Sequence, residues 1–232
     1  MKQEKIWEYF QSDPERAREL FSRARPMYLS KFLKSGLIVL NIGVGAGVLE
    51  EICLSKKVDI YALDPSESTI ANLRNRLGLH EKARAGYAQN IPFQDKFFDM
   101  VVMSEVLEHL DDQTLRRSLK EVRRVLRDDG RFFISVPFNE QLIGGLVICP
   151  NCGSDFHRFG HVRSFDKKEI EATLLGGGFL IDEMWVDTFV DWSRKGSLNF
   201  IKSMVRRLLG RIGSAIADPH ILVIARKGAA GN

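Results

Sequence analysis

The sequence contains few cysteines, little net charge and no long apolar run. Three cysteines among 232 residues are too few for a disulfide framework. A net charge of +4 is too small to indicate a nucleic-acid partner by itself, and the basic residues are not interleaved with aromatic ones as on a nucleic-acid-binding sheet. The first residues are charged and no stretch is apolar for long enough to span a bilayer, so we expect a cytoplasmic protein without an export signal.

What is present is the composition of an ordinary folded domain. Hydrophobic residues make up 44% of the chain and charged residues 28%. A length of 232 residues fits a single α/β domain with added segments, and the sequence contains neither an internal repeat nor a low-complexity segment. We therefore expect one domain over residues 1–232.

An apolar run over residues 37–42 is followed by three glycines at alternate positions, Gly43, Gly45 and Gly47. A continuous apolar run is typical of a parallel strand covered on both faces, and a helical pattern begins at Val48. The glycines let the backbone turn tightly and let a ligand approach without meeting a Cβ, while the helix points free N–H groups toward it. The unit therefore predicts a nucleotide-type binding site, with a tight turn that binds nothing as the alternative.

The spacing of the glycines separates two classes of nucleotide-binding protein. The dinucleotide fingerprint G-x-G-x-x-G requires a third glycine where this chain has Val48, which disfavours a nicotinamide-dependent oxidoreductase. The G-x-G-x-G pattern of this chain resembles the first motif of the class I S-adenosylmethionine-dependent methyltransferases. That resemblance implies a Rossmann-like fold, with S-adenosylmethionine bound over the three glycines as methyl donor.

An acidic residue ends the second predicted strand, residues 58–63. Asp64 lies close to the expected distance beyond the glycine turn, where a carboxylate accepts hydrogen bonds from both hydroxyls of a ribose. The alternative is that Asp64 only caps the next helix, although Ser66 and Ser68 are also suitable caps. The family resemblance implies that Pro65 lies beside the adenine.

Residues 97–110 resemble the fourth motif of these methyltransferases. Residues 100–103 predict a buried strand, and Ser104 and Glu105 follow at its carboxyl end, where open α/β sheets bind their ligands. The resemblance implies that Ser104 contacts the methionine part of the donor. His109 is either a catalytic candidate or a residue that only packs at a helix start.

The chain departs from the family at two donor-binding positions. Where relatives carry an aspartate that accepts a hydrogen bond from the adenine amino group, this chain has Tyr87. We expect Gln89, the N–H of Ala88 or a backbone carbonyl to contact the adenine instead. Asn41 replaces the acidic residue that many relatives carry at the end of the first strand, which removes a charge near the ammonium group of the donor.

Cys149, Cys152, His157 and His161 form a C-x2-C-x4-H-x3-H pattern. These residue types at this spacing suit a structural Zn2+ site, because four protein ligands leave no open position for catalysis. We therefore predict a zinc-binding insertion over residues 140–164. The alternatives are a site that uses the cysteines without one histidine, with His161 acting as a base or substrate anchor, and a reduced surface thiol pair.

Helical segments are predicted at two other places in the chain. Residues 1–34 predict an N-terminal helical cap, which either closes over the donor or only covers the sheet. Residues 191–219 contain a basic amphipathic helix. This helix either packs on the domain, forms a lid, or makes a peripheral membrane or lipid contact through residues 198–216.

Strand and helix patterns alternate from residue 37 to residue 137, and later strands are predicted at residues 179–190 and 220–225. Such alternation predicts a doubly wound sheet. The fold class that we expect is α/β: a Rossmann-like, mostly parallel seven-stranded sheet with a terminal antiparallel strand and a small zinc-knuckle insertion.

The predicted function is the SN2 transfer of a methyl group from S-adenosylmethionine to an unidentified acceptor, with a small molecule or a lipid favoured over nucleic acid. If the acceptor needs a general base, the candidates are His161, His109 and Glu105. The alternative is a catalytically silent module of the same fold that uses the zinc knuckle and the basic helix as partner surfaces. The sequence does not indicate an oligomeric state.

Overall fold

The computed structural model describes residues 23–190 and 197–228. Its centre is a seven-stranded sheet in the order β3-β2-β1-β4-β5-β9-β8, in which β9 runs antiparallel to both of its neighbours. The mostly parallel α/β sheet predicted from the sequence is therefore confirmed. The strands are β1 (Ile38–Ile42), β2 (Asp59–Asp64), β3 (Ala83–Ala85), β4 (Phe98–Ser104), β5 (Leu126–Pro137), β8 (Phe179–Asp187) and β9 (His220–Lys227).

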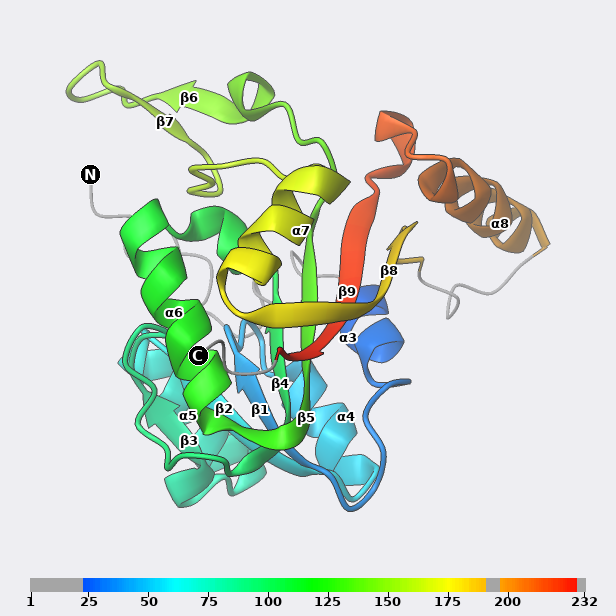
Figure 1. Cartoon of the computed structure of the whole chain (residues 1–232). Coiled ribbons are helices and arrows are strands. Elements are labelled where there is room, and N and C mark those ends of the chain that lie inside the picture. Colours follow the sequence, from blue (N-terminus) through cyan, green and yellow to red (C-terminus); the bar gives the residue numbers. More distant parts are fainter. Residues whose placement is uncertain (1–22, 191–196, 229–232) are drawn as a thin grey trace.

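Helices cover both faces of this sheet (Figure 1). On one face, α6 and α7 bury Leu119 and Ile170 in an apolar cluster with the strands. On the other face, α3, α4 and α5 bury Leu29, Leu49 and Leu73 in a second cluster. The helices named here are α3 (Ala24–Leu29), α4 (Val48–Ser55), α5 (Glu67–Leu77), α6 (Asp112–Val125) and α7 (Lys167–Gly176).

The central strands are apolar on both sides because both of their faces are covered. Leu40 and Val101 belong to the cluster on one face, and Val39 and Val102 belong to the cluster on the other. All four side chains are at most 1% exposed. This burial explains why the strands read in the sequence as continuous apolar runs rather than as alternating ones.

The order of the strands brings three strand ends together. The chain passes from β1 outward to β2 and β3, and then returns to β4 on the other side of β1. Ile42 therefore lies beside Leu63 of β2 and Met103 of β4. Connections that leave neighbouring parallel strands in opposite directions open a crevice, which is where such sheets bind ligands.

Capping residues set the helix boundaries. Asp166 forms a capping box with Glu169 at the start of α7. Ser66, rather than Asp64, caps α5, because its hydroxyl accepts the N–H of Thr69 at 3.2 Å. This leaves the Asp64 carboxylate without a capping role in α5.

Strand β5 contains a bulge near its start. It begins at Leu126, directly after α6. The pairing of β4 with β5 changes register between Phe98 and Met100, so the Asp-Asp-Gly stretch is a bulge inside the strand and not a helix end. A Cβ on Gly130 would lie 3.1 Å from the carbonyl oxygen of Phe98, which explains the glycine.

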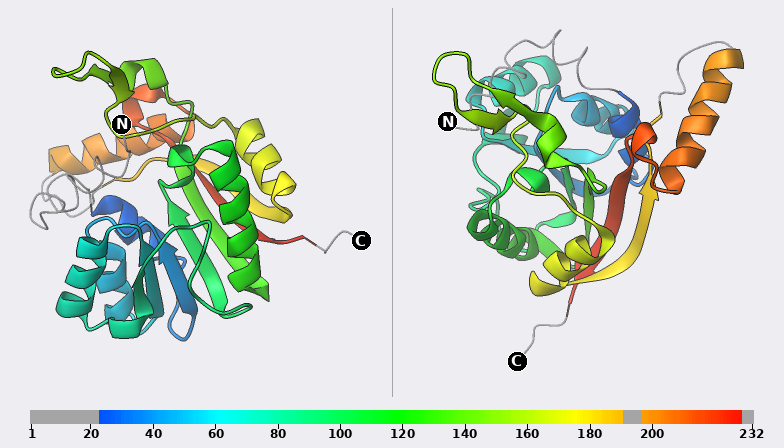
Figure 2. Two further views of the ribbon diagram at one scale, coloured as in Figure 1. Left: turned by 90° about the vertical axis from the view of Figure 1, so that its left-hand side faces the viewer. Right: turned by 90° about the horizontal axis from the view of Figure 1, so that it is seen from above.

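Two further segments lie at the same end of the molecule (Figure 2). One is a hairpin of β6 (Leu146–Ile148) and β7 (Asp155–His157), preceded by the short helix η3 (Leu142–Gly145). The other is α8 (Ser197–Arg211), followed by the short helix η4 (Ala215–Ala217). Other short helices are η1 (His80–Lys82) and η2 (Leu107–His109).

Parts of the predicted N-terminal cap and of the predicted basic helical segment lie outside the described residues. These parts are residues 1–22 and 191–196. Within the described ranges, no helix has both the length and the apolarity required to cross a membrane.

Candidate functional site

A cavity of about 1120 Å³ opens at the carboxyl ends of the central strands. Its wall includes residues from the loops after β1, β2, β4 and β5, and also from α3, η4 and the segment after β7. The predicted donor-binding residues that line it are Asn41, Gly43, Gly45, Asp64, Pro65, Ala88, Gln89 and Ser104. The topology thus brings together side chains that the sequence pattern had assigned to one ligand.

The glycines of the turn after β1 have different surroundings. Nothing lies within 4 Å of a Cβ placed on Gly45, so the backbone there is open to a ligand in the cavity. Gly47 does not line the cavity. A Cβ on Gly47 would lie 2.6 Å from the side chain of Leu73, and its φ of 72° also favours glycine. Gly47 therefore allows α4 and α5 to pack closely, and we expect Gly45 to be the glycine that faces a ligand.

Asp64 lies at the end of β2 and is 2% exposed. One carboxylate oxygen accepts the N–H of Val44 at 2.9 Å, and the other accepts the N–H of Ser66 at 2.9 Å. Burial raises the pKa of this carboxyl to about 6, although both backbone hydrogen bonds oppose the shift. The side chain is therefore rigidly placed at the cavity, with lone pairs left for further donors.

A buried acid lies behind Asn41, at the position where we expected a charge to be missing. The side-chain amide of Asn41 donates to Glu50 of α4 at 2.7 Å. Glu50 is fully buried, and this burial raises its pKa to about 7. Among the described residues its second oxygen has no hydrogen-bond partner. The carboxyl of Glu50 is thus next to Asn41 in space. The only signal for it in the sequence was a glutamate on the apolar face of α4.

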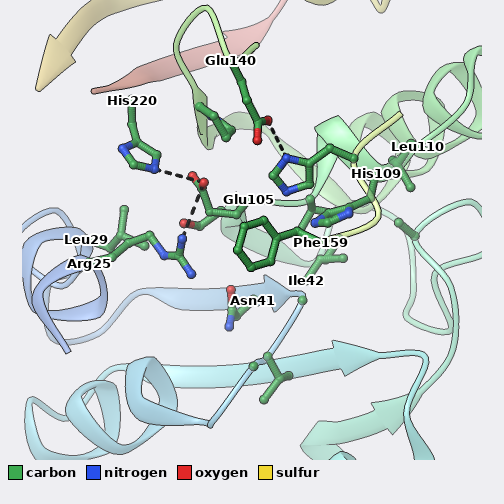
Figure 3. A pocket seen from close by; sticks show the side chains of 18 of the residues that line it. Arg25, Leu29, Asn41, Ile42, Glu105, His109, Leu110, Glu140, Phe159 and His220 are labelled. Atoms are coloured by element: carbon green, nitrogen blue, oxygen red, sulfur yellow. Dashed lines mark hydrogen bonds and ion pairs between the residues drawn. The ribbon is translucent and has the colours of Figure 1, made fainter. Parts of the chain in front are cut away.

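Glu105 is the centre of a charged network at the far wall of the cavity (Figure 3). Its carboxylate lies 3.1 Å from His220 and 3.6 Å from Arg25, and it accepts the hydroxyl of Ser135 at 2.8 Å. Burial would raise the pKa of Glu105, but the charges of His220 and Arg25 lower it to about 2. A carboxylate held in this way is a weak base, so the geometry disfavours the general-base role predicted for Glu105. Sequence reasoning missed Arg25 and His220.

A cluster of histidines and glutamates lies across the cavity from this network (Figure 3). Nδ1 of His161 lies 2.5 Å from a carboxylate oxygen of Glu140, and Nδ1 of His109 lies 3.2 Å from the carbonyl oxygen of Gly160. The rings of His109 and His161 meet edge to face, with centroids 4.7 Å apart. Burial and the neighbouring His161 lower the pKa of His109 to about 4, so this ring is neutral near pH 7. Glu140 was not predicted from the sequence.

The structure does not bring the four predicted zinc ligands together. Cys149 and Cys152 lie in the turn of the β6–β7 hairpin, whereas His157 pairs with Leu146 at its base. The three residue pairs of the hairpin separate the cysteine turn from the base, which corresponds to a distance of roughly 10 Å at the rise of a β-strand. Among the described residues, the groups that could hold a metal ion contain no cysteine. The predicted Cys2His2 zinc site is therefore wrong, because linear spacing does not reveal the register of a hairpin.

The central part of the chain is similar to a known family. Residues 40–134 match the model of a family described as a methyltransferase domain. A protein of Mycobacterium tuberculosis named as a probable S-adenosylmethionine-dependent methyltransferase is 30% identical over 142 residues, which cover 61% of this chain and 48% of that protein. The malonyl-acyl-carrier protein O-methyltransferase of Geobacter sulfurreducens is 28% identical over 205 residues, which cover 83% and 70%. This chain spans about half the length of the first of these relatives.

Solved structures share the fold at low sequence identity. A chain of the complex between the Haloferax volcanii Trm112 methyltransferase activator and a methyltransferase has a TM-score of 0.68 and 17% identity, over 96% of this chain and 97% of that one. A Burkholderia thailandensis N1-methyltransferase, solved with 1,6-didemethyltoxoflavin and S-adenosylhomocysteine, has a TM-score of 0.61 and 20% identity, over 89% and 79%. Similarity at these identities shows the fold alone.

The charged network around Glu105 leads to a first prediction. Replacing Glu105→Gln leaves His220 and Arg25 without their buried partner, so we expect the free energy of unfolding at pH 5.5 to fall by about 3 kcal/mol. Urea unfolding followed by circular dichroism measures this loss. The exposed pair of Asp59 with Lys82 is the matched control, and Asp59→Asn should cost less than about 1 kcal/mol.

The pH dependence tests the cause of this loss. Because the pKa of Glu105 is lower in the folded protein than its usual 4.5, its stabilising effect is complete above pH 4.5 and is lost as the pH falls toward 2. The pKa of His220 is raised above 6.5 in the folded protein, so the stabilising charge of its ring is complete below pH 6.5. This charge is lost as the pH rises through the raised pKa. We therefore expect the largest difference between pH 4.5 and 6.5, and an equal loss at every pH would contradict an ionic origin.

Proposed function

We propose, from the match of residues 40–134 to the model of a methyltransferase domain, that the protein transfers a methyl group from S-adenosylmethionine to an acceptor in the same cavity. The observation that carries the proposal is the convergence of the open glycine turn and the buried Asp64 at the crevice between β1 and β4. A Rossmann-like sheet binds a nucleoside at this place, with the ribose at the acid that follows the second strand.

Each part of the donor has residues of suitable chemistry. Asp64 accepts hydrogen bonds from the ribose hydroxyls, and the open backbone at Gly45 lies against the methionine part. Ala88 and Gln89 are next to the adenine, where exposed Tyr87 covers it from the solvent side. Ser104, hydrogen-bonded to Ser135 at 2.7 Å, borders the site of the reacting methyl group. This assignment extends the donor site predicted from the sequence, because it adds Tyr87 as a cover of the adenine and Ser135 as the partner of Ser104.

The ammonium group of the donor has a polar partner in Asn41. The amide oxygen of Asn41 is oriented by the bond that its NH2 group donates to Glu50. When Glu50 is ionised, its charge acts on the ammonium group through Asn41, so the replacement of an acidic residue by asparagine costs less affinity than the sequence suggested. Glu50 is in this sense a positioning residue.

The reaction needs alignment more than acid–base power. The sulfonium supplies a methyl group with a good leaving group: the bond from the acceptor atom to the methyl carbon forms as the C–S bond breaks, and its electron pair returns to sulfur. The walls of the cavity hold donor and acceptor in line and exclude water. His109 and His161 lie on the acceptor side, and because each donates from Nδ1, the lone pair of each ring is at Nε2.

The size of the cavity supports a small-molecule or lipid acceptor. About 1120 Å³ exceeds the usual volume of a site for one ligand, so there is room for an acceptor beside the donor. The names of the relatives include a malonyl thioester and a small heterocycle as acceptors, and neither choice is specific for this chain. The alternative of a silent binding module rests on the Tyr87 departure and predicts no donor binding at high micromolar concentration.

The surface of α8 favours an acceptor at a membrane. Its apolar residues form a stripe on the exposed side, while Gly210 packs closely against Thr188 and Arg207 pairs with Asp187 at 3.1 Å. Basic side chains border the stripe, which suits an anionic lipid surface. Arg206 and η4 also line the cavity, so a lipid bound there would lie near the donor. The stripe consists of Ile201, Met204, Val205 and Leu208 of α8, together with Ile212, which follows the helix, and Ile216 of η4; these side chains are 47–88% exposed.

Donor binding is the decisive test of the proposal. Titration calorimetry with S-adenosylmethionine should show binding to the full chain, and Asp64→Asn should weaken it about 10- to 100-fold, as expected for loss of a charged hydrogen-bond acceptor. Because the pKa of Asp64 is raised to about 6, the ionised form that accepts both hydroxyls prevails above pH 6. Affinity should therefore fall about tenfold per pH unit below 6.

The control for this titration is Glu50→Gln, which removes the other acid with a raised pKa near the donor. It should keep the decline of affinity below pH 6, whereas Asp64→Asn should abolish it. Absence of donor binding in the unmodified chain would refute the methyltransferase proposal and favour the silent module. Equal affinity of Asp64→Asn and the unmodified chain would refute the ribose assignment alone.

The membrane contact is tested by sedimentation with vesicles that contain phosphatidylglycerol. We expect the chain to co-sediment with them, and Leu208→Asp combined with Ile212→Asp to reduce binding at least tenfold, because two exposed apolar side chains no longer enter the interface. Leu175→Asp on α7, which is also half exposed, is the matched control and should leave binding unchanged. A chain that remains in the supernatant would leave a soluble acceptor as the proposal.

A further inference from the structure

Two side chains that line the acceptor side of the cavity, His109 and His161, form a cluster with buried Glu108 whose function the methyl donor does not explain. Glu108, His109 and His161 place one ligand-type atom each within 4.8 Å of the others. Glu108 and His109 come from η2, which follows β4, and His161 comes from the segment after β7. Two parts of the chain that are distant in sequence thus present two imidazoles and a carboxylate to one point.

The hydrogen bonds made by Nδ1 indicate the tautomer of each histidine. Nδ1 of His161 donates to Glu140 at 2.5 Å, and Nδ1 of His109 donates to the carbonyl oxygen of Gly160 at 3.2 Å. A neutral imidazole has one N–H, so Nε2 of each ring carries its lone pair. Histidines that bind metals almost always donate their other N–H to a carboxylate or a backbone carbonyl, which is the pattern of both rings here.

Glu108 supplies an independent observation. Its side chain is 1% exposed, and neither carboxylate oxygen has a hydrogen-bond partner among the described residues. A buried carboxyl whose oxygens lack partners is unfavourable even when it is neutral, and it can be ionised there only if it is paired or coordinates a metal. The carboxylate is close to the two imidazoles, so a cation between the three groups would satisfy it.

Glu140, His157 and His161 also have ligand-type atoms within 4.8 Å of one another, but Nδ1 of His157 and Nδ1 of His161 are already engaged in hydrogen bonds. Nδ1 of His157 accepts the N–H of His161 at 3.1 Å, so its hydrogen is on Nε2, which is directed at Gly145. A Cβ at Gly145 would lie 1.9 Å from that nitrogen. The carboxylate of Glu105 is already paired with His220. The donor set is therefore two imidazole nitrogens and one carboxylate.

We propose that Glu108, His109 and His161 bind one divalent first-row transition-metal ion at the acceptor side of the cavity. Two neutral imidazoles with one carboxylate suit such ions, whereas magnesium and calcium prefer oxygen ligands. Three protein ligands leave coordination positions open, unlike the closed four-ligand site predicted for Cys149 and Cys152. Glu140 is a positioning residue that orients the imidazole of His161.

The role of the ion in catalysis rests on the proposed function. His109 and His161 line the cavity, so the open positions are accessible to an acceptor. A hydroxyl bound to a divalent cation loses its proton more readily, as does a metal-bound water. The acceptor class that fits is an oxygen nucleophile: its proton passes to solvent, its oxygen bonds to the methyl carbon, and the C–S bond breaks with its electron pair on sulfur.

The experiment uses the full chain, stripped of metal with a chelator and titrated with Co2+. Equilibrium dialysis with metal analysis should show one ion per chain, and the visible spectrum should contain d–d bands without a thiolate charge-transfer band. Glu108→Gln and His161→Ala should abolish this binding. Cys149→Ser combined with Cys152→Ser should leave both the stoichiometry and the spectrum unchanged.

Two further variants keep the test decisive if a ligand variant unfolds. Glu140→Gln retains all three ligands and should weaken Co2+ binding about 10- to 100-fold, as expected for loss of the group that orients a ligand histidine. Glu81→Gln, at an exposed carboxylate elsewhere, should have no effect. Circular dichroism checks the fold of each variant without reference to donor binding.

The outcomes separate this proposal from the methyltransferase proposal. Co2+ binding is measured without the donor, and donor binding is measured on the metal-free chain. No bound ion, or binding that is lost in the cysteine variant and kept in Glu108→Gln, would overturn the metal site and leave the donor assignment intact. Metal binding without donor binding would support the site and overturn the proposed function.

Discussion

The pairing of β1 with both β2 and β4 is the constraint on which the rest of the structure depends. It places Ile42 beside Leu63 and Met103, so that three buried strands end at the same level. Helices cover the apolar side chains on both faces of these strands. Polar groups can therefore gather only at the strand ends. The cavity is a consequence of this topology: connections leave β1 and β4 in opposite directions and cannot close the space between them.

Four buried or nearly buried acids surround the cavity, and each is stabilised in a different way. Asp64 accepts two backbone N–H groups, Glu50 accepts the amide of Asn41 on one oxygen, and Glu105 has the charges of His220 and Arg25. Glu108 has no partner among the described residues. The two backbone hydrogen bonds of Asp64 leave lone pairs for a ribose, and the charges of His220 and Arg25 neutralise the carboxylate of Glu105. Glu108 lacks such a partner in the described part of the chain, and the cation that we propose would supply one.

The sequence was sufficient for the fold and for placing most of the candidate donor-binding residues at one cavity, because the signals there are local. Gly45 and Asp64 directly follow apolar runs that can be recognised as strands without knowing what they contact. Arg25 and His220 were missed because they meet Glu105 only through tertiary packing between distant elements. The zinc prediction failed for the related reason that spacing along the chain does not specify distance across a hairpin, whose pairing separates Cys149 from its base.

The same difference between local signals and tertiary contacts explains why the acceptor of a relative cannot be assigned to this chain. The family match covers residues 40–134, which include the glycine turn and Asp64, but Glu140, His161 and His220 lie outside it. The solved structures at 17–20% identity share the sheet of this chain. A shared sheet implies a crevice at the strand ends, but it does not specify the side chains that line the crevice. The rest of the cavity wall comes from the segments on either side of the β6–β7 hairpin, from η4 and from α3, of which α3 also buries Leu29 in the apolar core. The chemistry of the acceptor must therefore be inferred from the side chains of these segments in this chain.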